Sequence, residues 1–177
     1  MLRLDPRYII PALLLFACAA ADEPQPIDAD PVVAGIQEQI AADSANWQLQ
    51  AQLAGELRRK DRLAEAGVAA ERAFALAPEP GIEARLEMAK VHAAADRSAS
   101  AINVVKDAEK RKRAGEIVDE VKIAEVYAVL GDTAAVFRWL DRAVLASSPN
   151  VATLQANPDL AGMHADPRWV TLAAPAR

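Results

Sequence analysis

The sequence predicts an all-α protein, a short solenoid of three antiparallel helical hairpins with a leading helix and a C-terminal capping segment of short helices. Residues Ala54, Ala89 and Ala124 recur every 35 residues, and a fixed period between roughly 20 and 50 residues is typical of solenoids. The chain is 53% hydrophobic but only 5% aromatic. Much of its apolar content is alanine, the strongest helix former.

Small side chains recur at the positions where two helices of such a stack approach most closely. A large residue there would force the helices apart and strain the core. The set expected to pack in this way is Ala54, Ala66 and Ala73 in the first hairpin, Ala89, Ala101 and Ala108 in the second, and Ala124, Val136 and Ala143 in the third. Val136 is the one larger member, and it predicts a slightly splayed third hairpin.

Residues 1–21 have the pattern of a signal peptide. Arg3 and Arg7 give a positive start, and an apolar stretch of 14 residues follows from Tyr8 to Ala21. That stretch is too short to cross a bilayer as a helix. Its position and its flanks are typical of an export signal, which predicts a location outside the cytoplasm.

The signal could be cut in two ways. The run LFAC, ending at Cys18, resembles the cleavage box of bacterial lipoproteins, although Phe16 is larger than is usual there. The resemblance implies acylation of Cys18 and cleavage before it, and Ala19 after the cysteine implies an outer-membrane anchor facing the periplasm. An ordinary signal would instead be cut after Ala21 and release a soluble periplasmic protein.

The leading helix is predicted to follow a tether. Residues 22–30 are acidic and proline-rich, which favours an extended, flexible segment. Asp30 is a good N-cap and Pro31 suits the first helical position. The apolar face of this helix would contain Val32, Val33, Ile36 and Ile40. It would cover the open end of the stack.

The repeat domain is predicted to span residues 31–174. Its hairpins are expected at about 46–77, 81–113 and 116–147, followed by a tail at 149–174. The turns within the hairpins read KDRLAEA, ADRSASA and GDTAAVF. Three hairpins are close to the minimum for a stable stack, so the leading helix and the tail are expected to contribute to stability.

The third hairpin resembles the tetratricopeptide repeat family most clearly. Its run AEVYAVLGDTAAVFRWLDRA, residues 124–143, is similar to that family's alanine, tyrosine and glycine-turn pattern. The family's period is about 34 residues, so the period here implies one extra residue between hairpins. The resemblance covers residues 46–148 and is weaker in the first two units.

The tail is similar to segments often seen after such repeats in bacterial proteins. Asn157-Pro158 and Asp166-Pro167 each offer an N-cap and a helix-starting proline. The apolar residues expected to seal the last hairpin are Leu160, Met163, Trp169 and Leu172.

The family resemblance implies a partner-binding groove lined by the first helix of each hairpin. When the family's groove positions are transferred to this chain through the repeat register, the lining residues are Arg58, Arg59, Leu86, Lys90, Val118, Val121 and Glu125. The asparagines and lysines with which the family holds a peptide's C-terminal carboxylate are not present as a set. We therefore expect an apolar strip of Leu86, Val118 and Val121 flanked by cations, which suits a helix or extended segment with apolar anchors and some acidic residues.

The sequence lacks the residue patterns of catalysis. It offers no nucleophile and base in a known motif, no phosphate-binding loop, one cysteine and two histidines. We therefore expect no catalytic residue, no metal site and no cofactor. His92 falls at a packed position of the repeat, which favours a structural role. The net charge of −5 also argues against nucleic acid as a partner.

Two roles remain open from the sequence. One is a lipid-anchored adaptor or scaffold in the cell envelope that binds a protein or peptide in its groove. The other is a structural subunit that braces an envelope complex through its convex face or tail. An enzyme of unrecognised type is disfavoured because no catalytic residue pattern is present.

Overall fold

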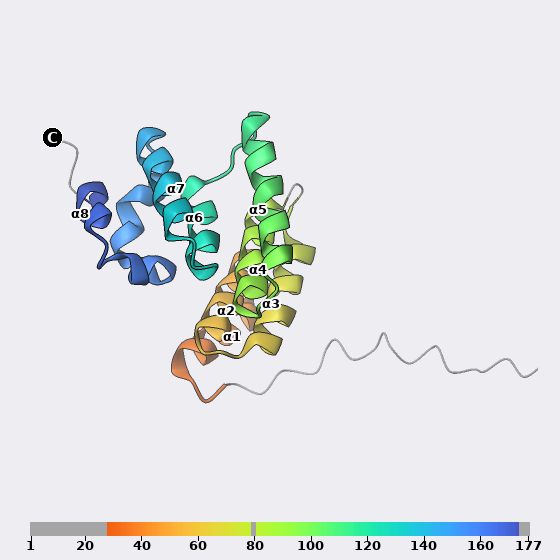
Figure 1. The fold of residues 1–177 in the computed structure, drawn as a ribbon. Coiled ribbons are helices and arrows are strands. Elements are labelled where there is room, and N and C mark those ends of the chain that lie inside the picture. Colours follow the sequence, from red (N-terminus) through yellow and green to blue (C-terminus); the bar gives the residue numbers. More distant parts are fainter. Residues whose placement is uncertain (1–27, 79–80, 174–177) are drawn as a thin grey trace, which may run out of the picture.

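The computed structural model describes residues 28–78 and 81–173, and within these ranges the ordered elements are helices and no strand occurs (Figure 1). The predicted all-α fold class is confirmed. The elements are α1 (Pro31–Ala42), α2 (Trp47–Arg59), α3 (Leu63–Leu76), α4 (Ile82–Ala94), α5 (Ser98–Arg113), α6 (Glu120–Val129), α7 (Thr133–Leu145), the 3₁₀ helices η1 (Pro149–Ala156) and η2 (Pro158–Met163), and α8 (Pro167–Ala173).

The helices pack as three successive pairs. Helix α2 contacts α3, α4 contacts α5, and α6 contacts α7. The first helices of the pairs also contact one another in the order α2, α4, α6, and α3 contacts α4. Helix α1 packs on α2 at the start of the stack, and the chain then runs through the pairs in sequence order (Figure 1).

Each hairpin turns through one residue in the left-handed conformation. These residues are Asp61 (φ 60°), Asp96 (φ 57°) and Gly131 (φ 77°), and they are 35 residues apart. The following N–H donates back to a carbonyl five residues earlier, with N···O distances of 2.8–3.0 Å for Arg62 to Leu57, Arg97 to His92 and Asp132 to Tyr127. This bond pattern is that of a Schellman helix end. The sequence period is therefore also a period of the backbone.

The predicted small positions all lie inside the stack. All nine residues of that set, including Val136, have no exposed surface. One apolar cluster joins α1 to the first hairpin through Val33, Ala54 and Ala66. A second cluster continues from α4 through α7 into the tail, where it includes Leu160 and Trp169.

Two details of the predicted helices need correction. Asp30 caps α1 as expected, its carboxylate accepting from the N–H groups of Val32 and Val33, but the side chain of Val32 is exposed. Helix α6 begins at Glu120 and not near 116, because Asp119 acts as its N-cap. Ile117 consequently lies outside the helix and is 99% exposed.

The end of the predicted tether is held against the domain. Asp28 pairs with Arg62, and the Asp30 carboxylate lies 2.6 Å from Nζ of Lys60. Residues 28–30 are therefore part of the folded domain, in contrast to the prediction. The predicted signal peptide, Cys18 and residues 22–27 lie outside the described residues.

The tail consists of two 3₁₀ helices and one short α-helix, of which η1 and α8 contact α7 and η2 contacts α6. Asp119 holds its beginning, accepting from Oγ of Ser148 at 3.1 Å and from Nδ2 of Asn150. Asn157 caps η2 as predicted, since its side chain accepts from the N–H of Asp159 at 3.0 Å. Leu160 and Trp169 are buried, and Met163 and Leu172 pack against the same core. Helix η2 contacts α6, which places Asp159 beside the inner helices.

Candidate functional site

The predicted apolar strip is wrong. Leu86, Val118 and Val121 are at most 3% exposed and belong to the core cluster. The apolar residues of α4 and α6 pack into the stack, and polar residues at neighbouring register positions form the inner surface. The charged members of the predicted groove (Arg58, Arg59, Lys90 and Glu125) do come together there.

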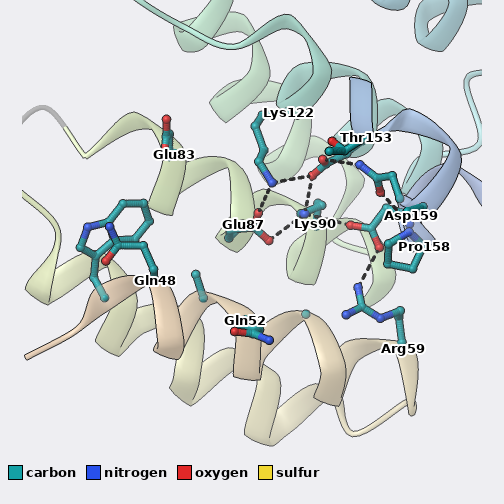
Figure 2. A pocket seen from close by; sticks show the side chains of 16 residues that line it. Gln48, Gln52, Arg59, Glu83, Glu87, Lys90, Lys122, Thr153, Pro158 and Asp159 are labelled. Carbon is teal, nitrogen blue, oxygen red and sulfur yellow. Dashed lines mark hydrogen bonds and ion pairs between the residues drawn. The ribbon is translucent and has the colours of Figure 1, made fainter. Parts of the chain in front are cut away.

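The inner surface forms an open cavity of about 470 Å³ that is lined mainly by polar and charged residues (Figure 2). Helices α2, α4 and α6 form its floor, and the tail residues Asn157, Pro158 and Asp159 form one end. Its open part is lined by Trp47, Gln48, Gln52, Glu83, Glu87, Lys122 and Thr153. We call this hollow the inner groove.

Lys90 lies at the deep end of the inner groove. Its Nζ is 2.7 Å from Glu87, 2.7 Å from Glu125 and 2.9 Å from Asp159, and its side chain is 4% exposed. Burial alone would lower the pKa of Lys90, but the three carboxylates raise it above its ordinary value. Lys90 therefore stays charged.

Asp159 reaches this cluster from the tail. Its carboxylate pairs with Arg58, lies 3.1 Å from Nη1 of Arg59, and accepts a 2.9 Å hydrogen bond from Lys90. Its side chain is only 4% exposed. Burial would raise the pKa of Asp159, but the charges of Lys90 and Arg58 hold it well below its usual range. Three cations from two repeats thus bind one carboxylate of the chain's own tail.

Glu125 connects the same cluster to the tail through a second contact. One of its oxygens accepts from Nδ2 of Asn157 at 2.8 Å, and the other accepts from Lys90 at 2.7 Å. Burial would raise the pKa of Glu125, whereas Lys90 and Lys122 lower it below the ordinary value. Asn157 and Asp159 are thus both held by side chains of the inner groove.

The three tryptophans differ in their burial. Trp139 and Trp169 are buried in the core, whereas Trp47 is half-buried on the rim of the inner groove. His92 lines a different cavity between α3 and α4, of about 390 Å³. His164 is exposed in the tail and its ring centroid lies 4.5 Å from that of Trp169.

The described residues contain no group of three or more histidine, cysteine or acidic side chains arranged to hold a metal ion. In the same ranges no helix is both long and apolar enough to cross a membrane. Arg59 and Lys90, which line the inner groove, bind the carboxylate of Asp159 together with Arg58. Gln48 and Gln52, which face the open part of the groove, can bind amides.

No family model matches this chain, and neither a curated protein nor a solved structure matches it.

Proposed function

We propose that this chain is a non-enzymatic adaptor that binds a segment of a protein partner in the inner groove. The observation that carries the proposal is that a peptide segment already lies there. Asn157 and Asp159, two residues apart on one backbone, are both held by side chains from α2, α4 and α6. A groove that recognises one segment through side-chain contacts has the chemistry to recognise another.

The resemblance of residues 124–143 to tetratricopeptide repeats supports the same role. Proteins of that family use the concave face of a stack to bind peptides, and rigid packed helices position such a surface well. The burial of Leu86, Val118 and Val121 changes the expected partner. The partner would be recognised mainly by polar and charged groups, with Trp47 on the rim as one aromatic contact.

Photo-crosslinking in the native cell envelope tests the adaptor role. A photoreactive residue at Gln48 or Gln52, both exposed in the inner groove, should yield one discrete crosslinked protein. Lys122→Glu should abolish that product because it reverses a charge beside the cavity. The matched control is Asn103 on α5, which is exposed and does not line the cavity. Equal products from Asn103 and from the groove positions would refute the proposal.

We also propose that the chain acts at the bacterial envelope, attached through an acyl group on Cys18. The support is the signal pattern of residues 1–21 and the LFAC run. Several acyl chains would hold the protein stably, since each buried CH₂ contributes about 0.8 kcal/mol. Labelling with palmitate should mark the wild type and not Cys18→Ser. Equal labelling, or none in either protein, would contradict the anchor.

A bracing role through the convex face or the tail is the second candidate. It is favoured by large apolar side chains that are exposed on the last elements, Leu145 of α7 and Val170 of α8. Photoreactive residues at these two positions extend the crosslinking experiment. A product from them, with none from Gln48 or Gln52, would support bracing over the adaptor role.

A further inference from the structure

The contact between Arg58 and Asp159 uses only part of the guanidinium. Nη2 of Arg58 pairs with one oxygen of Asp159, while Nε has no hydrogen-bond acceptor among the described residues. The Arg58 side chain is 8% exposed, so little water can reach it. A buried guanidinium N–H without a partner is unfavourable, and a carboxylate with two oxygens facing Arg58 would satisfy both nitrogens.

We propose that Asn157 and Asp159 form an internal ligand, occupying the site that an acidic segment of the partner takes when it binds. This inference rests on the proposed function. The partner would present a carboxylate to Arg58, Arg59 and Lys90, and a side-chain amide two residues earlier to Glu125. Binding would move η2 away from the inner groove.

The geometry allows this exchange because the internal ligand borders open space. Asn157, Pro158 and Asp159 line the cavity together with Arg59 and Lys90, so an incoming chain can reach these two cations from the open part of the groove (Figure 2). The tail has two other attachments that need not move. Ser148 is bonded to Asp119 at one end, and Trp169 is buried in the core at the other.

Displacement of η2 would expose Leu160, which follows Asp159 in the sequence and is fully buried. A partner that replaces the tail must therefore also refill the apolar space that Leu160 leaves. This requirement defines the partner further: an aliphatic residue follows its acidic residue. The partner segment thus has an amide, a spacer, a carboxylate and an aliphatic side chain in that order.

The probe for this inference is a fluorescent peptide with the sequence LQANPDLAGM, which duplicates residues 154–163. Its affinity is measured by fluorescence anisotropy with the full chain, as wild type, as Asp159→Asn and as Leu160→Ala. Asp159→Asn removes the internal carboxylate, and Leu160→Ala loosens η2 without changing any charge. We expect both variants to bind the peptide at least tenfold more tightly than the wild type.

Two controls establish that the carboxylate is recognised. A peptide with asparagine in place of its aspartate should bind the variants at least tenfold more weakly. Adding Arg58→Gln to Leu160→Ala should abolish binding, because Arg58 is the cation that gains most from the incoming carboxylate.

The inference is overturned if both single variants keep their helical circular dichroism and bind the peptide no more tightly than the wild type. Equal binding of the aspartate and asparagine peptides also overturns it. So does loss of helical structure in both variants, since the tail would then be unable to leave a folded stack. If the peptide does not bind the variants while crosslinks from Gln48 or Gln52 persist in the envelope, the adaptor role stands. The proposal that Asn157 and Asp159 form an internal ligand is then wrong.

Discussion

Nζ of Lys90 lies 2.7 Å from a carboxylate oxygen of Glu125, which occupies the same position one repeat of 35 residues later. Glu87 and Lys122 are also separated by 35 residues, with the charges reversed, and their nearest N and O atoms are 3.5 Å apart. Opposite charges at equal register therefore face each other across α4 and α6. The repeat that aligns the helices also aligns these ion pairs.

The three ion pairs of Lys90 predict that removing this cation lowers the stability of the fold strongly. Lys90→Met should lower the free energy of unfolding by about 3–5 kcal/mol, because it leaves buried carboxylates without their shared partner. Lys122→Met is the matched control on the neighbouring helix. Its side chain is 32% exposed, so we expect a loss below about 1 kcal/mol. Urea denaturation of both variants measures the difference, and equal losses would contradict a special role for Lys90.

The Asp159 and Glu125 carboxylates predict a loss of stability in acid. The pKa of each is lower in the folded chain than its ordinary value. Groups of this kind stabilise the fold above the unfolded-state pKa, about 4 for Asp and Glu, and the stabilisation disappears as pH falls through the folded-state pKa. The melting temperature should be steady from neutral pH to about pH 5 and then fall.

The melting temperature of Asp159→Asn should fall much less on acidification than that of the wild type. The difference in melting temperature between wild type and Asp159→Asn should be largest near neutral pH and shrink below about pH 4. The raised pKa of Lys90 acts in the opposite direction. Its contribution is complete below the unfolded-state pKa of about 10.4 and is lost only as pH rises above that value. A wild type and a variant that differ equally at every pH would refute the assignment.

The left-handed turn residues predict a stabilising substitution. Asp96 has φ 57° and an exposed side chain, and a residue with a Cβ is strained in that conformation. Asp96→Gly should raise the free energy of unfolding by about 0.5–1 kcal/mol, and Asp61→Gly should do the same one repeat earlier. Gly131→Ala is the reciprocal control and should lower it by about 1 kcal/mol. Destabilisation by both aspartate substitutions would show that relief of backbone strain at this turn is outweighed by the lost aspartate side chain and the added freedom of the unfolded chain.

The backbone and the core were largely predictable from the sequence because each follows from a local, repeated signal. The alanine positions identified the closest helix contacts, and all of them are buried. The caps at Asp30 and Asn157 followed from their residue type and the prolines after them. Helix α6 begins later than predicted because Asp119 is a stronger N-cap than any residue near 116.

The site was predicted less well because it depends on a non-local contact. Arg58, Lys90 and Glu125 could be placed near the groove by the register transferred from the family resemblance. Asp159 could not, since its position relative to Arg58, 101 residues earlier in the sequence, depends on how the tail folds back onto α6. One signal was available in the sequence: Lys90 with Glu125, and Glu87 with Lys122, stand 35 residues apart with opposite charges. That pairing predicts a polar inner surface.

The buried alanines predict that the stack tolerates no bulk at its closest contacts. Ala89 of α4 has no exposed surface and lies in the core cluster that continues to α7. Ala89→Leu should lower the free energy of unfolding by about 1–3 kcal/mol or more, because the added carbons must separate packed helices. Ala99→Leu on α5 is the control, since Ala99 is exposed, and its effect should stay within about 0.5 kcal/mol. Thermal and urea unfolding of the two variants measure this contrast. If Ala89→Leu unfolds like the wild type, close approach of the helices does not explain why small residues recur in this chain.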